Sequence, residues 1–279
     1  MNQPVTKTTA PQCGALRMPG FVFEPSGGWV QPKRLVEACL ADAQERLGER
    51  LAVHFNAFVD ARSIAALQET SHAVVLCTAD SAHGPWGQGL CLNRIAGQLS
   101  WLPADSSEGP PQVVCGDGYV APVVDGRLLV GASFDRLGES YDELLDGPCL
   151  KVTVAGHDGN RRRLEALLPQ LATRMVDRWP MAQGRTSVRV ATRDRLPHIG
   201  LLWDESSELP RSVSRLEQMP RQQGLYVLLG LGARGLSAAP MAADALAHWI
   251  LKGEPPQGRI WQAVDPARFV LRAHQRAET

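Results

Sequence analysis

The feature that most constrains the fold lies near the C-terminal end of the chain, where an apolar run breaks into closely spaced glycines. Residues 225–229 are Leu-Tyr-Val-Leu-Leu, residues 230–235 contain three glycines, and apolar residues at helical spacing follow up to residue 250. A strand that turns through glycines into a helix gathers backbone N–H groups and the positive end of the helix dipole, which suits a phosphate or an electron-rich ring. The same glycines also fit a plain strand-to-helix turn with close packing, and both interpretations stay open.

Helix and strand patterns elsewhere indicate two kinds of sheet. Pro32 stands at the first position of a predicted helix over 32–47 that Gly48 ends. Strands are predicted at 51–55 and 73–77, the second apolar throughout, as in a parallel sheet. Short antiparallel strands are expected at 99–101, 112–115, 119–124 and 127–131, with Asp125-Gly126 as a two-residue hairpin turn. The remaining predictions are a strand at 21–23, a helix at 164–171, a strand at 185–191 and a surface excursion at 204–223.

This order of elements predicts a mixed α/β fold, with α+β character in its middle part. With 279 residues, of which 44% are hydrophobic, the chain is long enough to bury a substantial core. We expect residues 31–85 and 224–279 to form one discontinuous domain. Residues 86–223 would be an antiparallel domain inserted into it, and residues 1–30 a tail at the edge of that second domain.

Composition argues against several classes of protein. No segment approaches the ~20 apolar residues of a membrane-spanning helix, and the N-terminal residues lack the apolar block of a signal peptide, so we expect a cytoplasmic protein without a membrane partner. The six cysteines contain no C-x-x-C pair, and some, such as Cys39 and Cys77, have apolar neighbours, which favours reduced core thiols. The seven histidines show no ligand spacing, and we expect no metal site.

The net charge is zero, but the two halves of the chain differ in sign. Residues 1–150 carry 10 basic and 17 acidic side chains, whereas residues 151–279 carry 19 basic and 12 acidic ones. Nearly all basic residues of the second half are arginines. Such an asymmetry indicates a nucleic-acid or acidic partner for one face, although solvated arginine faces are also common without one.

Several short stretches together identify a protein family more specifically than any one of them does alone. They are residues 27–35, 74–77, 97–98, 116–119 with Pro122, 129–133, 189–197 with Gly200, and 230–240. In this combination the chain resembles the FAD-dependent D-amino acid oxidase and glycine oxidase superfamily. Residues 188–197, 230–235 and 265–269 with Arg272 narrow the resemblance to the FAD-dependent C-terminal half of the bifunctional enzymes of tRNA wobble-uridine modification.

The resemblance implies a Rossmann-like FAD-binding domain with an inserted antiparallel substrate domain, as in D-amino acid oxidase. It implies an oxidoreductase that oxidises the carbon–nitrogen bond of 5-carboxymethylaminomethyl(-2-thio)uridine, releasing the carboxymethyl arm as glyoxylate and leaving the aminomethyl base. The implied partners are tRNA and the methyltransferase domain of the same enzyme in a full-length form.

The chain also departs from the family pattern. Family members begin with a strand–helix–strand that bears G-x-G-x-x-G and an acidic residue for the adenosine ribose, and the N-terminal residues here contain neither. Ala79 stands where the family usually places a glycine near the cofactor. We therefore expect an incomplete FAD-binding domain and weak FAD binding by this chain alone. Removal of one sheet edge predicts self-association or reduced stability.

The resemblance assigns catalytic roles to two residues. Arg189 would bind the substrate carboxylate as a planar, bidentate donor, and Tyr119 would donate its phenol to the same carboxylate. Alternatives are a structural salt bridge of Arg189 with Asp194 or Asp117, and a half-buried sheet aromatic at Tyr119.

The resemblance also assigns the cofactor contacts. Gly232, Ala233, Arg234 and Gly235 would pass along the isoalloxazine ring, where backbone N–H groups can stabilise negative charge, and Gly230 and Leu236 are further cofactor-binding residues. Arg234 is also a candidate substrate or phosphate contact, or an exposed surface arginine. Val53 and Thr78 are expected on the adenine side of FAD, and Trp29 and Gln98 beside the substrate pocket; ordinary packing is the alternative for each.

Phosphate contacts to tRNA are expected from arginines of the basic half, namely Arg161, Arg162, Arg163, Arg268 and Arg272. Two other functions compete with the tRNA-modifying oxidase. A small-molecule amine or amino-acid oxidase would act on free glycine or sarcosine without salt-sensitive RNA binding. A non-catalytic remnant would act by binding alone, as the missing G-x-G-x-x-G segment favours.

Overall fold

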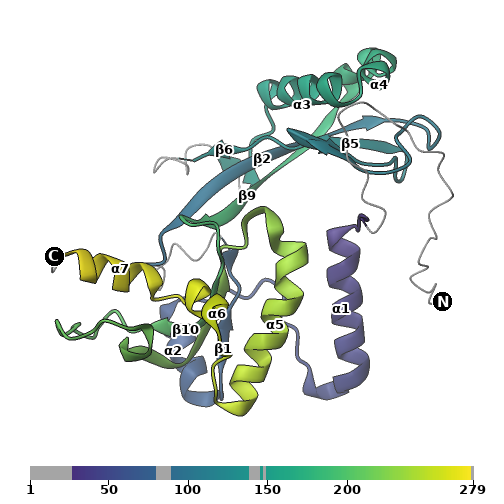
Figure 1. Cartoon of the computed structure of the whole chain (residues 1–279). Helices are drawn as coiled ribbons and strands as arrows, with labels where there is room; N and C mark the ends of the chain where they lie inside the picture. Colours follow the sequence, from purple (N-terminus) through teal and green to yellow (C-terminus); the bar gives the residue numbers. More distant parts are fainter. Residues whose placement is uncertain (1–26, 80–88, 138–144, 147–148, 278–279) are drawn as a thin grey trace.

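Two β-sheets organise the chain (Figure 1). The structure is a computed structural model, and it describes residues 27–79, 89–137, 145–146 and 149–277. The predicted strand at 21–23 lies outside these residues. The strands are β1 (Val74–Leu76), β2 (Leu92–Pro103), β3 (Val114–Gly116), β4 (Gly118–Val120), β5 (Arg127–Gly131), β6 (Asp135–Arg136), β7 (Leu145–Asp146), β8 (Cys149–Leu150), β9 (Gln183–Thr192), β10 (His198–Trp203) and β11 (Arg221–Leu229). The α-helices are α1 (Pro32–Leu47), α2 (Ala61–Thr70), α3 (Val154–Leu167), α4 (Pro169–Arg174), α5 (Gly235–Lys252), α6 (Arg259–Val264) and α7 (Arg268–Ala277). Short 3-10 helices are η1 (Gly48–Arg50), η4 (Val176–Met181), η5 (Leu216–Gln218) and η6 (Gly232–Arg234).

The smaller sheet has the strand order β1–β11–β10, with β1 parallel and β10 antiparallel to β11. Because side chains alternate along a strand, the odd-numbered residues 225–229 of β11 join Ile64 of α2 in one core cluster, and the even-numbered ones pack against α5 in another. The apolar run thus forms a central strand buried on both faces, as predicted. Strand β10 belongs to this sheet, although its residues lie in the segment expected to form the inserted domain.

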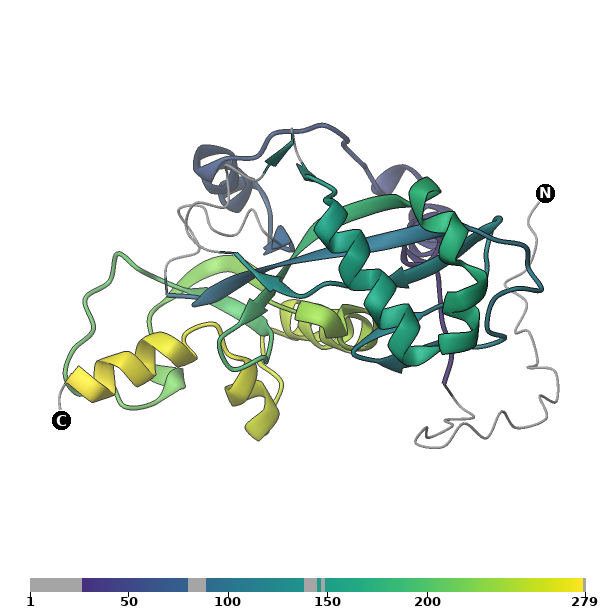
Figure 2. The same cartoon turned by 90° about the horizontal axis from the view of Figure 1, so that it is seen from above.

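The larger sheet is antiparallel and has the order β3–β4–β5–β2–β6, with β9 also paired to β2. The predicted hairpin turn is confirmed: Asp125 and Gly126 have φ values of 50° and 71°, which a type I′ turn requires. Figures 1 and 2 show α3 and α4 lying across one face of the long strands β2 and β9, while α5 begins beneath the other face.

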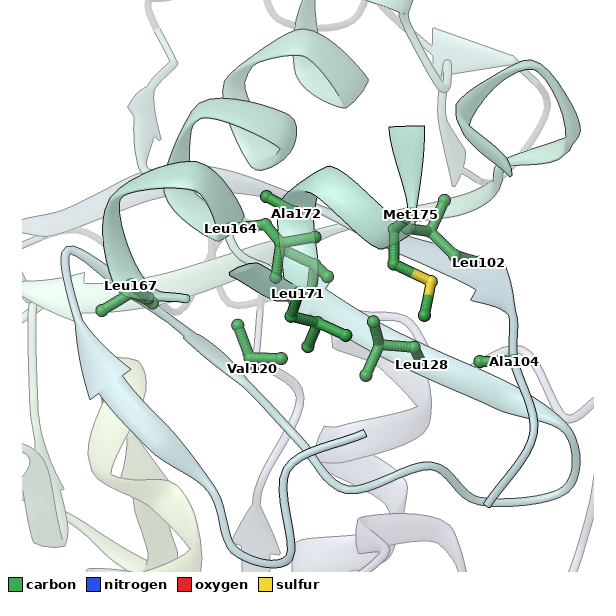
Figure 3. Close-up of a cluster of buried hydrophobic side chains, with 10 residues drawn as sticks. Leu102, Ala104, Val120, Leu128, Leu164, Leu167, Leu171, Ala172 and Met175 are labelled. Atoms are coloured by element: carbon green, nitrogen blue, oxygen red, sulfur yellow. The ribbon is translucent and has the colours of Figure 1, made fainter. Parts of the chain in front are cut away.

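The largest core cluster fills the space between this sheet and α3 and α4 (Figure 3). Leu102, Val120 and Leu128 come from the sheet, and Leu164 and Leu171 from the helices. Residues 164–171 were expected to form one helix, but α3 begins ten residues earlier and ends at Leu167, where Pro169 starts α4. Proline lacks the N–H that would continue α3, which explains the break.

Helix α1 begins with Pro32 and ends at Gly48 (φ 56°), as predicted, but none of its residues is buried. Residues 51–55, expected to form a strand, have no regular structure and find no partner strand among the described residues. Cys39 and Cys77 are free thiols but exposed, so the expectation that they lie in the core is wrong. Cys39 lies in α1, which has no buried residue, and Cys77 directly follows the buried Leu76 at the end of β1.

Candidate functional site

Arg189 lies in β9 on the face of the large sheet opposite α3. Its neighbour on β2 is Ile95, and two residues further along β2 Gly97 makes room for the guanidinium. A Cβ atom on Gly97 would lie 2.6 Å from both terminal nitrogens of Arg189. The glycine therefore forms a cradle that fixes where the guanidinium sits.

The guanidinium of Arg189 has unused donors. Its Nη1 donates to the carbonyl of Ser133 at 3.3 Å, and the group lies 5.9 Å from the centre of the exposed Phe134 ring. Within the described ranges, no carboxylate forms an ion pair with it, and the alternative of a salt bridge with Asp194 or Asp117 is not seen. A planar donor with free N–H groups is suited to bind a carboxylate in a bidentate manner.

Tyr119 of β4 shares this face with Arg189. It pairs with Gly131 of β5, which pairs with Leu99 of β2, and odd-numbered residues of β2 and β9 point to the same side. Burial raises the pKa of Tyr119, although the positive charge of Arg189 lowers it in part. The phenol therefore keeps its proton at neutral pH and can donate a hydrogen bond.

The glycine turn after β11 lies against the end of β9. Leu231 forms a β-bridge with Ala191, two residues beyond Arg189 on the same face. Gly230 and Gly232 have φ values of 72° and 57°, and a Cβ on Gly230 would approach the Thr192 side chain to 2.7 Å. Only glycine accommodates both the backbone conformation and this contact. The structure thus brings the turn next to the strand that carries Arg189.

Helix α5 opens from this turn without a cap. Its N-cap residue Arg234 makes no side-chain capping hydrogen bond and donates from Nη2 to the carbonyl of Arg195 at 3.0 Å instead. Ala233 and Leu236 are exposed. The N–H groups at the start of this 18-residue helix have no side-chain cap, and such groups can donate to an electron-rich group. The glycines have the spacing G-x-G-x-x-G between a strand and a helix, in the turn that the sequence singled out. This turn fits one part of a flavin nucleotide.

The other predicted cofactor and pocket residues are more scattered. Thr78 follows β1, whose carboxyl end lies at the same sheet edge as the glycine turn because β1 and β11 are parallel. Val53 lies in the irregular segment before α2, and Trp29 lies before α1; both are exposed. Arg189 lines neither the cavity beside α3 nor the one beside η4.

Gln98 was expected beside the substrate pocket, and this expectation is wrong. Its side chain is 4% exposed on the opposite face of β2, beneath α3. There its Oε1 accepts from the backbone N–H of Thr153 and its Nε2 donates to the Thr153 carbonyl, both at 2.9 Å. Alternation along β2 explains the error, because the neighbouring Gly97 is the residue that faces Arg189.

Arg268 was expected to contact tRNA, and this expectation is also wrong. Its side chain is 2% exposed and binds Asp194 through Nε and Nη2, at 3.0 and 2.8 Å. It also donates to the Leu196 carbonyl and to Nδ1 of His198. Burial works to raise the pKa of Asp194, but the hydrogen bonds and charge of Arg268 hold it well below its usual value. The group is a structural link between α7 and the turn after β9.

The remaining arginines lie at the surface or beside a cavity. Arg272 is half exposed and reaches the same Asp194 at 3.5 Å. Arg161 pairs with Glu165 of α3 at 3.5 Å, Arg162 is exposed, and Arg163 is partly buried. Arg161, Arg162, Arg163 and Arg272 therefore remain available to solution to different degrees.

His198 predicts a pH-dependent stability. Burial and the charge of Arg268 lower its pKa to about 4, whereas an unfolded histidine has a pKa of about 6.5. Because the pKa of His198 is lower in the folded state than in the unfolded state, the neutral imidazole stabilises the fold at pH values above the unfolded-state pKa. This stabilisation is lost as the pH falls towards the folded-state pKa. We expect the free energy of unfolding to drop by roughly 3 kcal/mol between pH 7 and pH 4.

Urea denaturation across this pH range measures the effect. His198→Gln is the matched variant, because its amide can donate to the Leu90 carbonyl and accept from Arg268 as the imidazole does. It should flatten the pH dependence. A wild-type profile that is already flat between pH 4 and pH 7 contradicts the prediction.

Comparison with known proteins defines the class of protein to which this chain belongs. Residues 3–249 match the model of the DAO family, described as FAD dependent oxidoreductase, and the chain belongs to this family. The expected family, its FAD cofactor and the D-amino acid oxidase-like fold class are thereby confirmed.

More particular relatives are found among tRNA-modifying proteins. The chain is 34% identical over 273 residues to the tRNA 5-methylaminomethyl-2-thiouridine biosynthesis bifunctional protein MnmC of Burkholderia thailandensis, covering 92% of this chain and 40% of the relative. It is 35% identical over 270 residues to the protein of the same name from Burkholderia mallei, covering 91% and 39%. The chain thus spans about two fifths of the length of these relatives. A solved glycine oxidase from Geobacillus kaustophilus has a TM-score of 0.49 and 18% identity, over 70% of this chain and 45% of that one.

The described residues also bear on membrane and metal partners. In the part of the chain that the structure describes, no helix is long and apolar enough to cross a membrane. Over the same residues, no group of three or more His, Cys, Asp and Glu side chains gathers to hold a metal ion.

Proposed function

We propose that this chain is the FAD-dependent oxidase part of a tRNA modification enzyme. Its substrate would be 5-carboxymethylaminomethyl(-2-thio)uridine at the wobble position, from which it removes the carboxymethyl arm to give the aminomethyl base. The observation that carries the proposal is the placement of Arg189 and Tyr119 on one sheet face, with the turn at residues 230–235 bridged to β9 two residues beyond Arg189. The names of the relatives support tRNA as the substrate.

The chain's own residues would hold the arm to be removed. Arg189 would bind the carboxylate with its free N–H groups, and the protonated Tyr119 would donate to one of its oxygens. Bound FAD supplies the acceptor for the hydride that leaves the carbon beside the carboxylate. Water then releases this carbon as glyoxylate and leaves the amine on the base. The N–H groups at the start of α5 would stabilise negative charge on the cofactor ring.

The proposal includes the partners of a longer enzyme. A methyltransferase domain of the same polypeptide would act on the aminomethyl base, and the site of action would be the cytoplasm. Among the described residues, nothing covers the apolar residues of α1 and no strand pairs with the outer edge of β1, which favours a covering partner, either a second copy of this chain or a further segment.

A substrate comparison tests the proposed function. With FAD added anaerobically, bleaching of the flavin absorbance is expected with tRNA that carries the carboxymethylaminomethyl group. Free glycine and sarcosine should bleach it far more slowly, and tRNA binding should weaken steeply with salt. Rapid reduction by glycine together with salt-insensitive RNA binding would instead identify a small-molecule oxidase. No reduction by any of these substrates at saturating FAD would favour a non-catalytic remnant.

Gly97 offers a direct test of the cradle beneath Arg189. Gly97→Ala should raise KM for the carboxylate-bearing substrate by about tenfold or more, because the new methyl group displaces the Arg189 guanidinium from its position above residue 97. Affinity for FAD should change little, since Gly97 lies on β2 away from the glycine turn. Steady-state kinetics and a flavin titration measure the two quantities, and an unchanged KM contradicts the role given to the glycine.

A further inference from the structure

A second basic site lies on the other face of the large sheet. A cavity of about 210 Å³ opens between α3 and the turn that joins β3 to β4. Its walls are formed by Asp117, Gly159, Arg162, Arg163, Ala166 and Leu167. None of these residues belongs to the site around Arg189.

Two glycines hold Arg163 in position beside the cavity. A Cβ on Gly118 would lie 2.6 Å from Cδ of Arg163, so the arginine stem rests on the bare backbone of the turn. A Cβ on Gly159 would lie 3.1 Å from its Nη1. The side chain is thus packed in one place before any ligand arrives, which reduces the entropy that binding must overcome.

The buried nitrogen of this arginine lacks a partner. Nε of Arg163 is inaccessible to solvent and makes no hydrogen bond. An unsatisfied buried donor is costly, and this cost is higher for a charged group. An anion in the cavity would accept from the terminal guanidinium nitrogens of Arg163, with the exposed Arg162 as the second donor.

The acidic residue in the wall forms no ion pair with these arginines. Within the described residues, Asp117 lies beyond ion-pair distance of Arg162 and Arg163, whereas the neighbouring Arg161 is paired with Glu165. Arg161 therefore provides a matched residue on the same helix, outside the cavity.

The position of the turn links the cavity to the sheet face with Arg189. Gly118 faces α3, while the next residue, Tyr119, faces the opposite side. Strand β3 is the edge of the sheet, so no further strand blocks the way around this turn within the described part of the chain. One extended ligand could pass from one face to the other here.

We propose that this cavity is a phosphate subsite that binds one phosphodiester of the RNA whose modified base reaches Arg189 and Tyr119. The inference rests on the proposed function for the identity of the RNA. The chemistry is that of guanidinium groups with phosphate oxygens, to which they donate in a forked geometry.

Substitution of Arg163 tests the subsite with two probes, inorganic phosphate and tRNA. Arg163→Met should weaken phosphate binding by tenfold or more in calorimetric titration, and it should lower the slope of log K against log salt for tRNA by roughly 0.7–0.9. Arg161→Met should leave phosphate binding unchanged. Circular dichroism checks that both variants fold.

Substitution of Asp117 provides a second test that does not disturb the packing of Arg163. Asp117→Asn removes a negative charge from the wall, so it should tighten phosphate binding severalfold. Equal effects of Arg163→Met and Arg161→Met, or no response to Asp117→Asn, would overturn the subsite and leave the proposed function standing. Phosphate binding that depends on Arg163 without any tRNA binding would overturn both the RNA occupant and the proposed function.

Discussion

Replacing Arg189 with methionine should reduce oxidation of the carboxylate-bearing substrate by about 10²- to 10⁴-fold in kcat/KM. The estimate follows from two charge-assisted hydrogen bonds of about 1.5–3 kcal/mol each, which the variant cannot form. The methionine side chain still fills the space above Gly97, so the sheet should remain intact. Anaerobic flavin reduction at several substrate concentrations measures the loss.

Arg185→Met is the matched control for this prediction. Arg185 lies four residues earlier on β9, on the same face, and pairs with Leu99. Its replacement should change kcat/KM by less than a few-fold. Arg189→Lys should retain part of the activity that Arg189→Met loses, because a lysine keeps the positive charge but cannot donate in a bidentate manner. Similar losses in the Arg185 and Arg189 variants would remove Arg189 from its proposed role.

Arg268→Met should destabilise the fold by about 3–5 kcal/mol, because it breaks a buried ion pair and removes the charged donor that Asp194 and the Leu196 carbonyl share. The effect should spread to the turn after β9, since Arg234 donates to the Arg195 carbonyl in that turn. Urea denaturation at pH 7 measures the change in the free energy of unfolding.

Arg272→Met serves as its control. Arg272 reaches the same carboxylate at 3.5 Å, but its side chain is 51% exposed. Exposed pairs contribute about 0–1 kcal/mol, so this variant should stay close to wild type. If the two variants lower the free energy of unfolding by the same amount, burial does not set the strength of the ion pair between Arg268 and Asp194.

Local patterns predicted those parts of the chain whose structure depends on neighbouring residues. Pro32 and Gly48 bound α1, Asp125 and Gly126 form the hairpin turn, and the apolar run 225–229 is a central strand. These outcomes follow from backbone preferences and side-chain alternation, which act over a few residues. The position of the glycine turn at the start of α5 follows from the same rules.

Features that depend on distant partners were missed. Arginine composition did not reveal that Arg268 is buried, because Asp194 and His198 lie about 70 residues away in sequence. The cradle at Gly97 needs the pairing of β2 with β9, and Gln98 was assigned to the wrong face for the same reason. The apolar segment 51–55 predicted a strand, but no described strand pairs with it. Such features require the tertiary structure.

A crystal structure of the chain soaked with FAD and a small carboxylate, such as glycolate, tests the central claim most directly. The account predicts the flavin ring at the turn of residues 230–235, and the carboxylate within hydrogen-bond distance of Arg189 and Tyr119. Density for the ring at another part of the molecule, or a carboxylate bound away from Arg189 while the ring lies at the turn, would contradict it.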